Sequence, residues 1–203
     1  MKKVFYVCLT LFSIHYSSAQ EVQSSVSSPS SDNKGTYGIK GGLNFSTITK
    51  GNFDEGADPR TSYYIGFFSE IPLINKVLSL QPEVLYSRQG FETNFRLLGT
   101  NYKQEYRIDY INVPVLAKIH LGRVLAVEAG PQFGFKINEK IKSENSTSTN
   151  DDVNSFDTAL AAGLSLKIDD FLISGRYTYS FNEVIKNTDS KNSVFQIGIG
   201  FYF

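Results

Sequence analysis

The chain has 203 residues, and its 20 Lys and Arg balance its 20 Asp and Glu, so the formal net charge at pH 7 is zero. No basic excess argues for nucleic acid as a partner, and no apolar stretch reaches the roughly 20 residues that a transmembrane helix needs. The only cysteine, Cys8, lies in the leader, so we expect neither an internal disulfide nor a thiolate metal site in the mature chain. The 12 Tyr, 16 Phe and 16 Gly, with a single Met, favour strands over helices.

The amino-terminal segment has the pattern of an exported protein. A basic start at Lys2 and Lys3 precedes a short apolar run, and the small residues Ser17, Ser18 and Ala19 follow it. This predicts a signal peptide over residues 1–19, cleaved before residue 20. Residues 20–35 are rich in Ser, Gln, Pro and Asn and bury little, so we expect a flexible leader. The folded domain is then expected over residues 36–203.

Eight later segments alternate between apolar and polar residues with the period of two that is typical of strands. No helical period fits them as well. The segments are 37–45, 63–71, 78–87, 110–119, 125–135, 157–168, 171–179 and 193–203.

The last segment is the most regular, and one of its faces is entirely apolar. Gln196, Gly198 and Gly200 lie on the opposite face. A strand with lipid on one side and a polar lumen on the other needs no second layer to cover it. We therefore expect this strand to face lipid and to carry the signal for the barrel-assembly machinery. The apolar residues are Phe195, Ile197, Ile199, Phe201 and Phe203.

The connectors between the segments alternate strictly between long and short. Short connectors lie at 72–77, 121–123 and 169–170, and long polar connectors lie at 47–61, 91–106, 138–155 and 181–192. Outer-membrane barrels have short periplasmic turns and long extracellular loops. The pattern therefore predicts an all-β fold, an eight-stranded antiparallel up-and-down transmembrane β-barrel, with both termini in the periplasm.

Three prolines, Pro82, Pro114 and Pro131, lie inside expected strands. Because proline cannot donate to the strand ladder, we expect a local bulge at each of these positions.

Four motifs resemble the PorT-like outer-membrane β-barrel family of Bacteroidetes. They are Tyr37-Gly38-Ile39-Lys40-Gly41-Gly42-Leu43-Asn44-Phe45, Leu80-Gln81-Pro82-Glu83-Val84-Leu85-Tyr86-Ser87-Arg88-Gln89-Gly90-Phe91, Tyr110-Ile111-Asn112-Val113-Pro114-Val115-Leu116-Ala117-Lys118 and Glu128-Ala129-Gly130-Pro131. The resemblance spans roughly residues 35–203 and implies a small outer-membrane barrel, but no single activity. The family usually has an acidic residue before the proline of the fourth segment, where this chain has Asn112.

The faces expected to point inward carry four acids and four bases. Because an eight-stranded barrel has room only for side chains, charges held there must be paired. We expect a structural ion-pair network that plugs the lumen, with Glu83, Glu128, Lys118 and Arg176 in its middle layer. The eight residues are Lys40, Glu70, Glu83, Lys118, Glu128, Asp157, Lys167 and Arg176.

No motif predicts catalysis, a metal site or a cofactor. His120 is the only histidine after the signal peptide, and we expect it at the membrane interface rather than in an active site. Among the connectors, Phe95, Arg96, Leu97 and Leu98 combine aromatic, basic and apolar residues, and they are the candidate interaction patch. The alternative for this patch is a strand that extends into the aromatic belt.

The sequence therefore indicates an integral outer-membrane barrel with a structural or interaction role through its outer loops. Outer-membrane lipid and the barrel-assembly machinery are the expected partners, and no extracellular or periplasmic protein partner can be named. Three other interpretations stay open: a soluble lipocalin-like barrel with apolar faces turned inward around a ligand, a small-solute pore, and an outer-membrane enzyme acting through His120.

Overall fold

The computed structural model describes residues 35–49, 57–74, 77–97, 100–143, 146–148, 153–184 and 189–203. The expected signal peptide and all but the last residue of the expected leader lie outside these ranges. Within them the chain forms nine strands and no helix long and apolar enough to cross a membrane. The strands are β1 (Thr36–Ile48), β2 (Asp58–Ile74), β3 (Leu78–Leu97), β4 (Thr100–Leu121), β5 (Leu125–Ser143), β6 (Ser146–Ser148), β7 (Phe156–Ile168), β8 (Phe171–Glu183) and β9 (Lys191–Tyr202).

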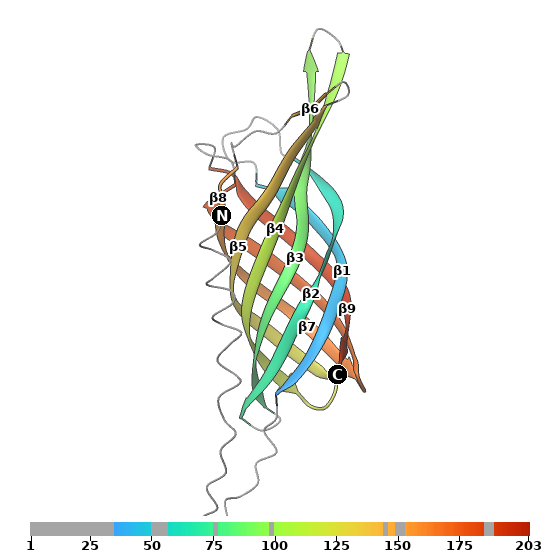
Figure 1. Cartoon of the computed structure of the whole chain (residues 1–203), viewed down its shortest axis with the longest axis vertical. Helices are drawn as coiled ribbons and strands as arrows, with labels where there is room; N and C mark the ends of the chain where they lie inside the picture. Colours follow the sequence, from blue (N-terminus) through green and yellow to red (C-terminus); the bar gives the residue numbers. More distant parts are fainter. Residues whose placement is uncertain are drawn as a thin grey trace, which may run out of the picture. The chain divides into compact units, whose positions relative to one another are not determined.

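Eight of these strands close into a barrel (Figure 1). Each strand pairs antiparallel with the next along the chain, and β1 pairs with β9 from Gly38 opposite Tyr202 to Ile48 opposite Asn192. The short β6 pairs only with the far end of β5 and is not part of the barrel wall. The predicted eight-stranded antiparallel up-and-down barrel is confirmed.

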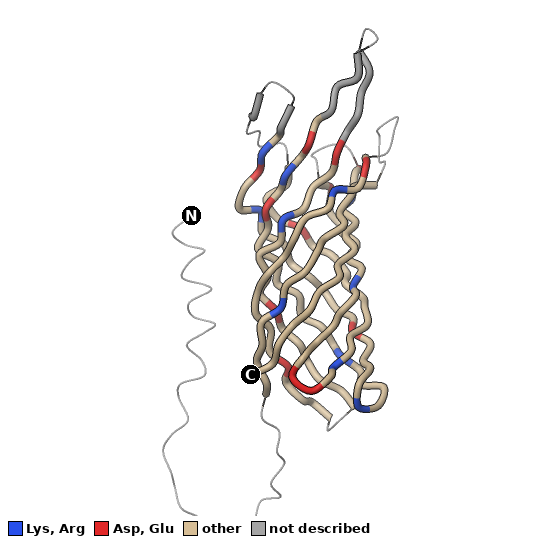
Figure 2. The backbone as a smooth tube through the Cα atoms, turned by 90° about the vertical axis from the view of Figure 1, so that its right-hand side faces the viewer, with Lys and Arg blue, Asp and Glu red and all other residues tan. Residues whose placement is uncertain are grey.

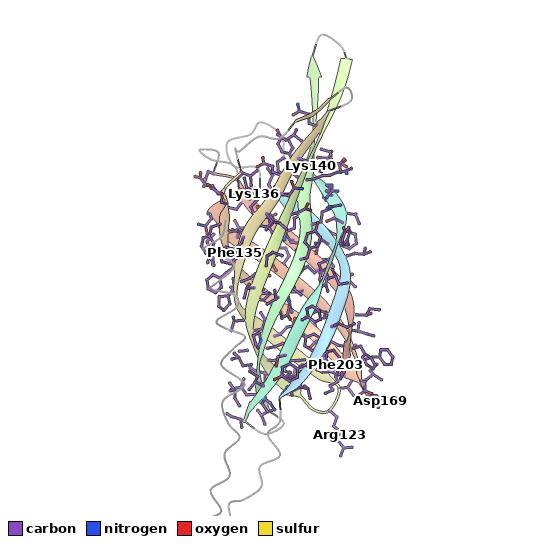
Figure 3. All side chains as sticks on the ribbon, viewed as in Figure 1. Arg123, Phe135, Lys136, Lys140, Asp169 and Phe203 are labelled. Carbon is purple, nitrogen blue, oxygen red and sulfur yellow. The ribbon has the colours of Figure 1, made fainter. Side chains whose placement is uncertain are left out.

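The side chains alternate in the sense expected for a barrel in lipid. Along β9 the side chains of Phe195, Ile197, Ile199 and Phe201 are exposed, whereas Val194, Gln196 and Tyr202 are buried. The same outward apolar and inward polar pattern recurs on the other strands, and Figure 3 shows large side chains projecting around the outside. The apolar faces therefore do not enclose a lumen, in contrast to the lipocalin-like alternative.

Two of the long connectors are shorter than predicted. β3 continues to Leu97 and β4 begins at Thr100, so most of the expected loop 91–106 is a strand hairpin, and β5 continues to Ser143 inside the expected loop 138–155. In Figure 1 these strands rise beyond the rest of the barrel. The alternation continues into β4 of this hairpin, where Tyr106 and Ile108 alternate with Glu105 and Arg107. The prediction failed here because the many polar and charged residues of these segments were interpreted as loops.

The prediction of bulges at the three prolines was wrong. The pairing register is the same on both sides of Pro82, Pro114 and Pro131. A proline removes one donor from the ladder but adds no residue, so the register continues past it. The register shifts lie elsewhere, for example between Asp109 and Tyr110 on β4.

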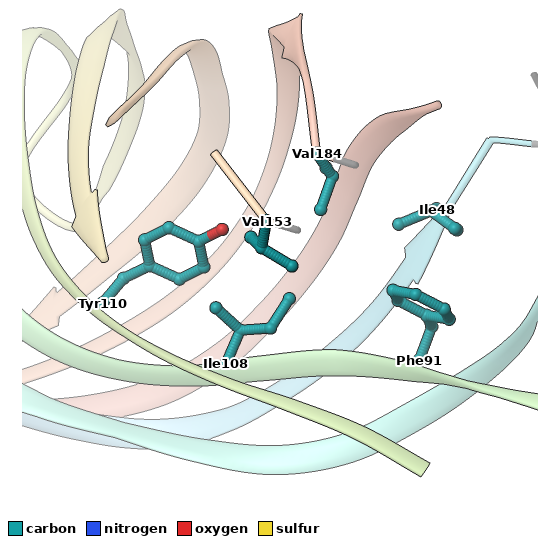
Figure 4. Packing of buried hydrophobic residues seen from close by; sticks show 6 residues of the cluster. All are labelled: Ile48, Phe91, Ile108, Tyr110, Val153 and Val184. Carbon is teal, nitrogen blue, oxygen red and sulfur yellow. The ribbon is translucent and has the colours of Figure 1, made fainter. Parts of the chain in front are cut away.

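An apolar cluster fills the lumen at the end from which β3 and β4 rise. Ile48, Phe91, Ile108 and Tyr110 come from barrel strands, whereas Val153 and Val184 come from segments beyond the strand ends and pack into the same cluster (Figure 4). The amino group of Lys136 donates to the Val153 carbonyl oxygen at 2.6 Å, which holds that segment in place. A smaller cluster of Phe68, Leu172 and Tyr202 lies toward the opposite end.

Candidate functional site: the charged lumen

A buried quartet of two acids and two bases spans the lumen below the apolar cluster. Arg176 on β8 donates to both carboxylate oxygens of Glu83 on β3, with both N–O distances 2.8 Å. The same guanidinium donates to Glu128 Oε1 on β5 at 2.9 and 2.7 Å. Lys40 on β1 donates to Glu83 Oε1 at 3.1 Å. Each of the four residues is at most 3% exposed.

The quartet has no net charge and joins four strands across the interior. A planar guanidinium suits this position because its donors form a rigid fork that matches two carboxylates at once. Removing one member would leave a buried charge without its partner, which is costly in a medium of low dielectric constant.

A second group lies toward the tight-turn end and connects to the quartet through Gln81. Gln81 donates to Glu83 Oε1 at 2.6 Å and accepts from Lys118 at 3.1 Å. Lys118 also donates to Glu70 Oε2 at 2.9 Å, and the Tyr202 hydroxyl donates to the same oxygen at 2.7 Å. Lys118 therefore lies in this second layer, next to the middle layer where we expected it.

His120 also belongs to the second group. Its Nε2 lies 2.8 Å from the Ser79 hydroxyl oxygen and 3.1 Å from Glu70 Oε1. A serine, a histidine and a glutamate are thus close together, but both contacts use the same imidazole nitrogen. In a hydrolytic triad the acid orients one nitrogen while the other activates the nucleophile. The observed contacts do not form that relay.

The structure brings together six of the eight predicted lumen residues. Asp157 lies apart and accepts a hydrogen bond from the Ser180 hydroxyl at 2.6 Å. The ammonium of Lys167 lies 4.1 Å from the centre of the Tyr202 ring. Neither residue forms an ion pair with the other side chains that the structure describes. The six that join the network are Lys40, Glu70, Glu83, Lys118, Glu128 and Arg176.

Sequence reasoning missed the polar side chains that link these charges. Ser79, Gln81 and Tyr202 lie on the inward faces of their strands, so alternation places them in the lumen. Nothing in the sequence indicated which charges they bridge. Asn112, at the position where the resembling family usually has an acid, is buried, and its Nδ2 has no hydrogen-bond partner among the described residues.

The predicted interaction patch lies on the raised hairpin. The backbone pairs Phe95 with Tyr102, Arg96 with Asn101 and Leu97 with Thr100. The side chains of these three residues, and Leu98 as a whole, lie outside the described part of the chain.

Further ion pairs lie at the base of the raised strands, where Figure 2 shows basic and acidic residues interspersed. Glu105 accepts from Arg60 at 2.6 Å and from Arg107 at 2.8 Å, and Arg88 donates to Asp109 at 2.7 Å. The hydrogen bonds from Arg107, aided by Arg60, lower the pKa of the Glu105 carboxyl to about 2. All five residues lay outside the expected strand segments, Arg60 in the expected loop 47–61 and Glu105 in the expected loop 91–106, so sequence analysis did not pair them.

A model of the family described as outer membrane protein beta-barrel domain matches residues 19–186. The chain belongs to this family. It is a small outer-membrane β-barrel protein, as the outward apolar faces require. A search of curated proteins finds no match for this barrel.

Solved structures of small barrels resemble the fold. Ail, the attachment invasion locus protein of Yersinia pestis, is 16% identical, with a TM-score of 0.51 over 84% of this chain and 99% of that chain. Neisserial surface protein A is 10% identical, with a TM-score of 0.58 over 82% of this chain and 97% of that chain. At these identities the likeness concerns the fold.

Proposed function

We propose that this outer-membrane barrel conducts no solute and acts as a binding protein through its raised end, outside the cell. The asymmetry of the two ends carries the proposal. One end closes with turns such as Asp169–Asp170, whereas at the other end the β3–β4 hairpin continues to Leu97 and Thr100. Short periplasmic turns and longer extracellular connections are typical of this class of barrel.

The filled lumen supports the non-conducting part of the proposal. The neutral quartet crosses the middle of the barrel, and the cluster around Phe91 and Ile108 occupies the raised end. We assign the charge network a structural role, in which it joins strands across the interior. A pore would instead need a continuous wet path between the two ends.

The remaining sequence predictions complete the proposal. Residues 1–19 would direct export and be removed, and the terminal strand around Ile199 and Phe201 would be recognised by the barrel-assembly machinery. The motifs around Pro82 and Pro114 support the PorT-like family of Bacteroidetes as the finer classification. We propose no catalysis, because His120 contacts Ser79 and Glu70 through one nitrogen.

The hairpin can be removed without cutting the barrel. Replacing residues 93–104 by Asn-Gly would join Glu92 to Glu105, which are paired partners, through a two-residue turn. Cells that display the wild-type barrel should adhere to protein-coated or polysaccharide-coated surfaces, and cells that display the shortened barrel should not. The matched control replaces Arg123, which lies in a turn at the opposite end, with Gln.

Conductance in planar lipid bilayers provides the second readout. We expect no single-channel steps from the wild-type protein. Stepwise conductance would contradict the non-conducting lumen. Equal adherence of the wild-type and shortened barrels, both folded, would contradict a binding role for the hairpin.

A further inference from the structure

A group of basic side chains on the outer surface of the barrel faces neither the lumen nor the hairpin tip. Arg88 on β3, Arg107 on β4 and Lys140 on β5 lie on neighbouring strands. Ile108 and Glu139, the adjacent residues on β4 and β5, are buried, so Arg107 and Lys140 point outward by alternation. Figure 3 shows Lys140 on the raised part of β5, beyond Phe135.

These positions match the depth of lipid headgroups. Phe135 and Ile137 are the last large apolar side chains exposed on β5 before Lys140. Three residues of strand advance about 10 Å, or about 8 Å along the membrane normal at a tilt of about 40°. The headgroup region extends roughly 5–8 Å beyond the hydrocarbon on each side. Lys140 and its neighbours therefore lie beside phosphate groups when Ile137 contacts acyl chains.

Most of the charge on this face is compensated, and Lys140 is the exception. Asp109 forms an ion pair with Arg88, while Glu105 forms ion pairs with both Arg60 and Arg107. Glu92 is the cross-strand partner of Glu105, and Asp58 is the partner of Glu92. Four acids thus face four bases when Lys140 is included. Among the described side chains, Lys140 has no ionic partner.

Arg107 and Lys140 are direct partners across the β4–β5 ladder. Side chains in such a pair have Cβ atoms about 4.5–5.5 Å apart, and two like charges placed this way repel each other. Arg107 donates through Nε and Nη2 to Glu105, and Arg88 donates through the same two nitrogens to Asp109 and Tyr86. Among the described residues no acceptor contacts either Nη1 group, so both can donate to another acceptor. An anion between Arg107 and Lys140 would relieve their repulsion and accept hydrogen bonds from both strands.

We propose that Arg88, Arg107 and Lys140 form a binding site for a phosphate group of a lipid headgroup in the outer leaflet. Arginine and lysine are the usual phosphate ligands, and the apolar side chains beneath them would pack against the acyl chains of the same lipid. The site rests on the barrel being embedded in a membrane and is independent of any binding at the hairpin tip.

The test measures lipid bound to detergent-extracted protein by native mass spectrometry. The probes are bis-phosphorylated lipid A, the same lipid without its phosphates, and inorganic phosphate. Wild-type protein should bind the phosphorylated lipid at least about ten-fold more tightly than the R107Q/K140Q double variant. Lys140→Arg should retain binding, and Arg123→Gln, an exposed cation at the opposite end, should leave it unchanged (Figure 3).

Three results would overturn the proposal. The double variant could bind the phosphorylated lipid as the wild type does, or the lipid without phosphates could bind equally well. Inorganic phosphate at the same concentration as the lipid could also displace it, which would indicate a site for free phosphate. Because Lys140 is exposed, its replacement alone should leave the barrel folded, and this single variant should already weaken binding of the phosphorylated lipid.

Discussion

Arg176 and Glu83, 93 residues apart in the chain, meet across the lumen in a two-pronged ion pair with N–O distances of 2.8 Å. Both side chains are buried, and each has a second charged partner, Glu128 for Arg176 and Lys40 for Glu83. The pair therefore connects β3 and β8, which are not neighbours in the sheet. We expect this contact to contribute to the stability of the closed barrel.

Replacing Arg176 with Ala should lower the free energy of unfolding by about 3–5 kcal/mol, because Glu83 and Glu128 would keep their buried charges with only Lys40 nearby. The double variant Glu83→Gln/Arg176→Met removes one charge of each sign and should lose less than the single variant. Urea unfolding of the barrel in lipid vesicles measures both. An unchanged midpoint for Arg176→Ala would exclude a stabilising network.

Replacing Phe91 with Ala should lower the free energy of unfolding by about 3–5 kcal/mol, because it leaves a cavity in the apolar cluster. Phe91 is buried and stacks on Tyr106 with ring centroids 4.5 Å apart. Phe181→Ala, at an exposed position on the outside, is the matched control and should lose less. Equal losses would indicate that the cluster around Phe91 is not packed as described.

The hairpin base should weaken in acid. The pKa of Glu105 is lowered to about 2 in the folded protein, chiefly by hydrogen bonds from Arg107, against about 4.3 in an unfolded chain. Its contribution to stability is therefore fully present above about pH 4.3 and is lost as the pH falls toward 2. Hydrogen exchange of the β3–β4 amides at pH 5 and at pH 2.5 should show this loss, and Glu105→Gln should abolish it. The same pH response in Glu105→Gln would assign the effect to another group.

The strands that cross the membrane were predictable because lipid and lumen impose opposite polarity on alternate residues. This rule alone places Ile197 on the outer face and Gln196 in the lumen. The raised hairpin was missed although Tyr106 and Ile108 alternate there with Glu105 and Arg107, because its polar composition was interpreted as a loop.

The sequence did not show which charged side chains contact each other inside the lumen. Alternation places Lys118 and Glu70 in the interior, but their contact depends on the stagger between strands as the barrel closes. The contact of His120 with Ser79 depends on the same stagger. The bulge predicted at Pro82 was wrong for a different reason, since the loss of one hydrogen-bond donor does not shift the pairing register.

The depth of a charge on the outer face should determine its cost. Ile199 lies in the middle of the apolar face of β9 and is 69% exposed, whereas Phe203 lies at its end. Ile199→Lys should lower the free energy of unfolding of the barrel in vesicles by about 2–4 kcal/mol, and Phe203→Lys should lower it by less than about 1 kcal/mol. Equal small effects would indicate that this face meets water.

The central claim is a closed barrel whose apolar surface faces lipid. The most direct test is the gel mobility of the protein from the outer-membrane fraction, compared with and without boiling in detergent. A closed ladder has no edge from which to open, so the unboiled protein should run as a compact band and shift only on heating. A protein that shows no shift and is recovered in the soluble periplasmic fraction would contradict the account.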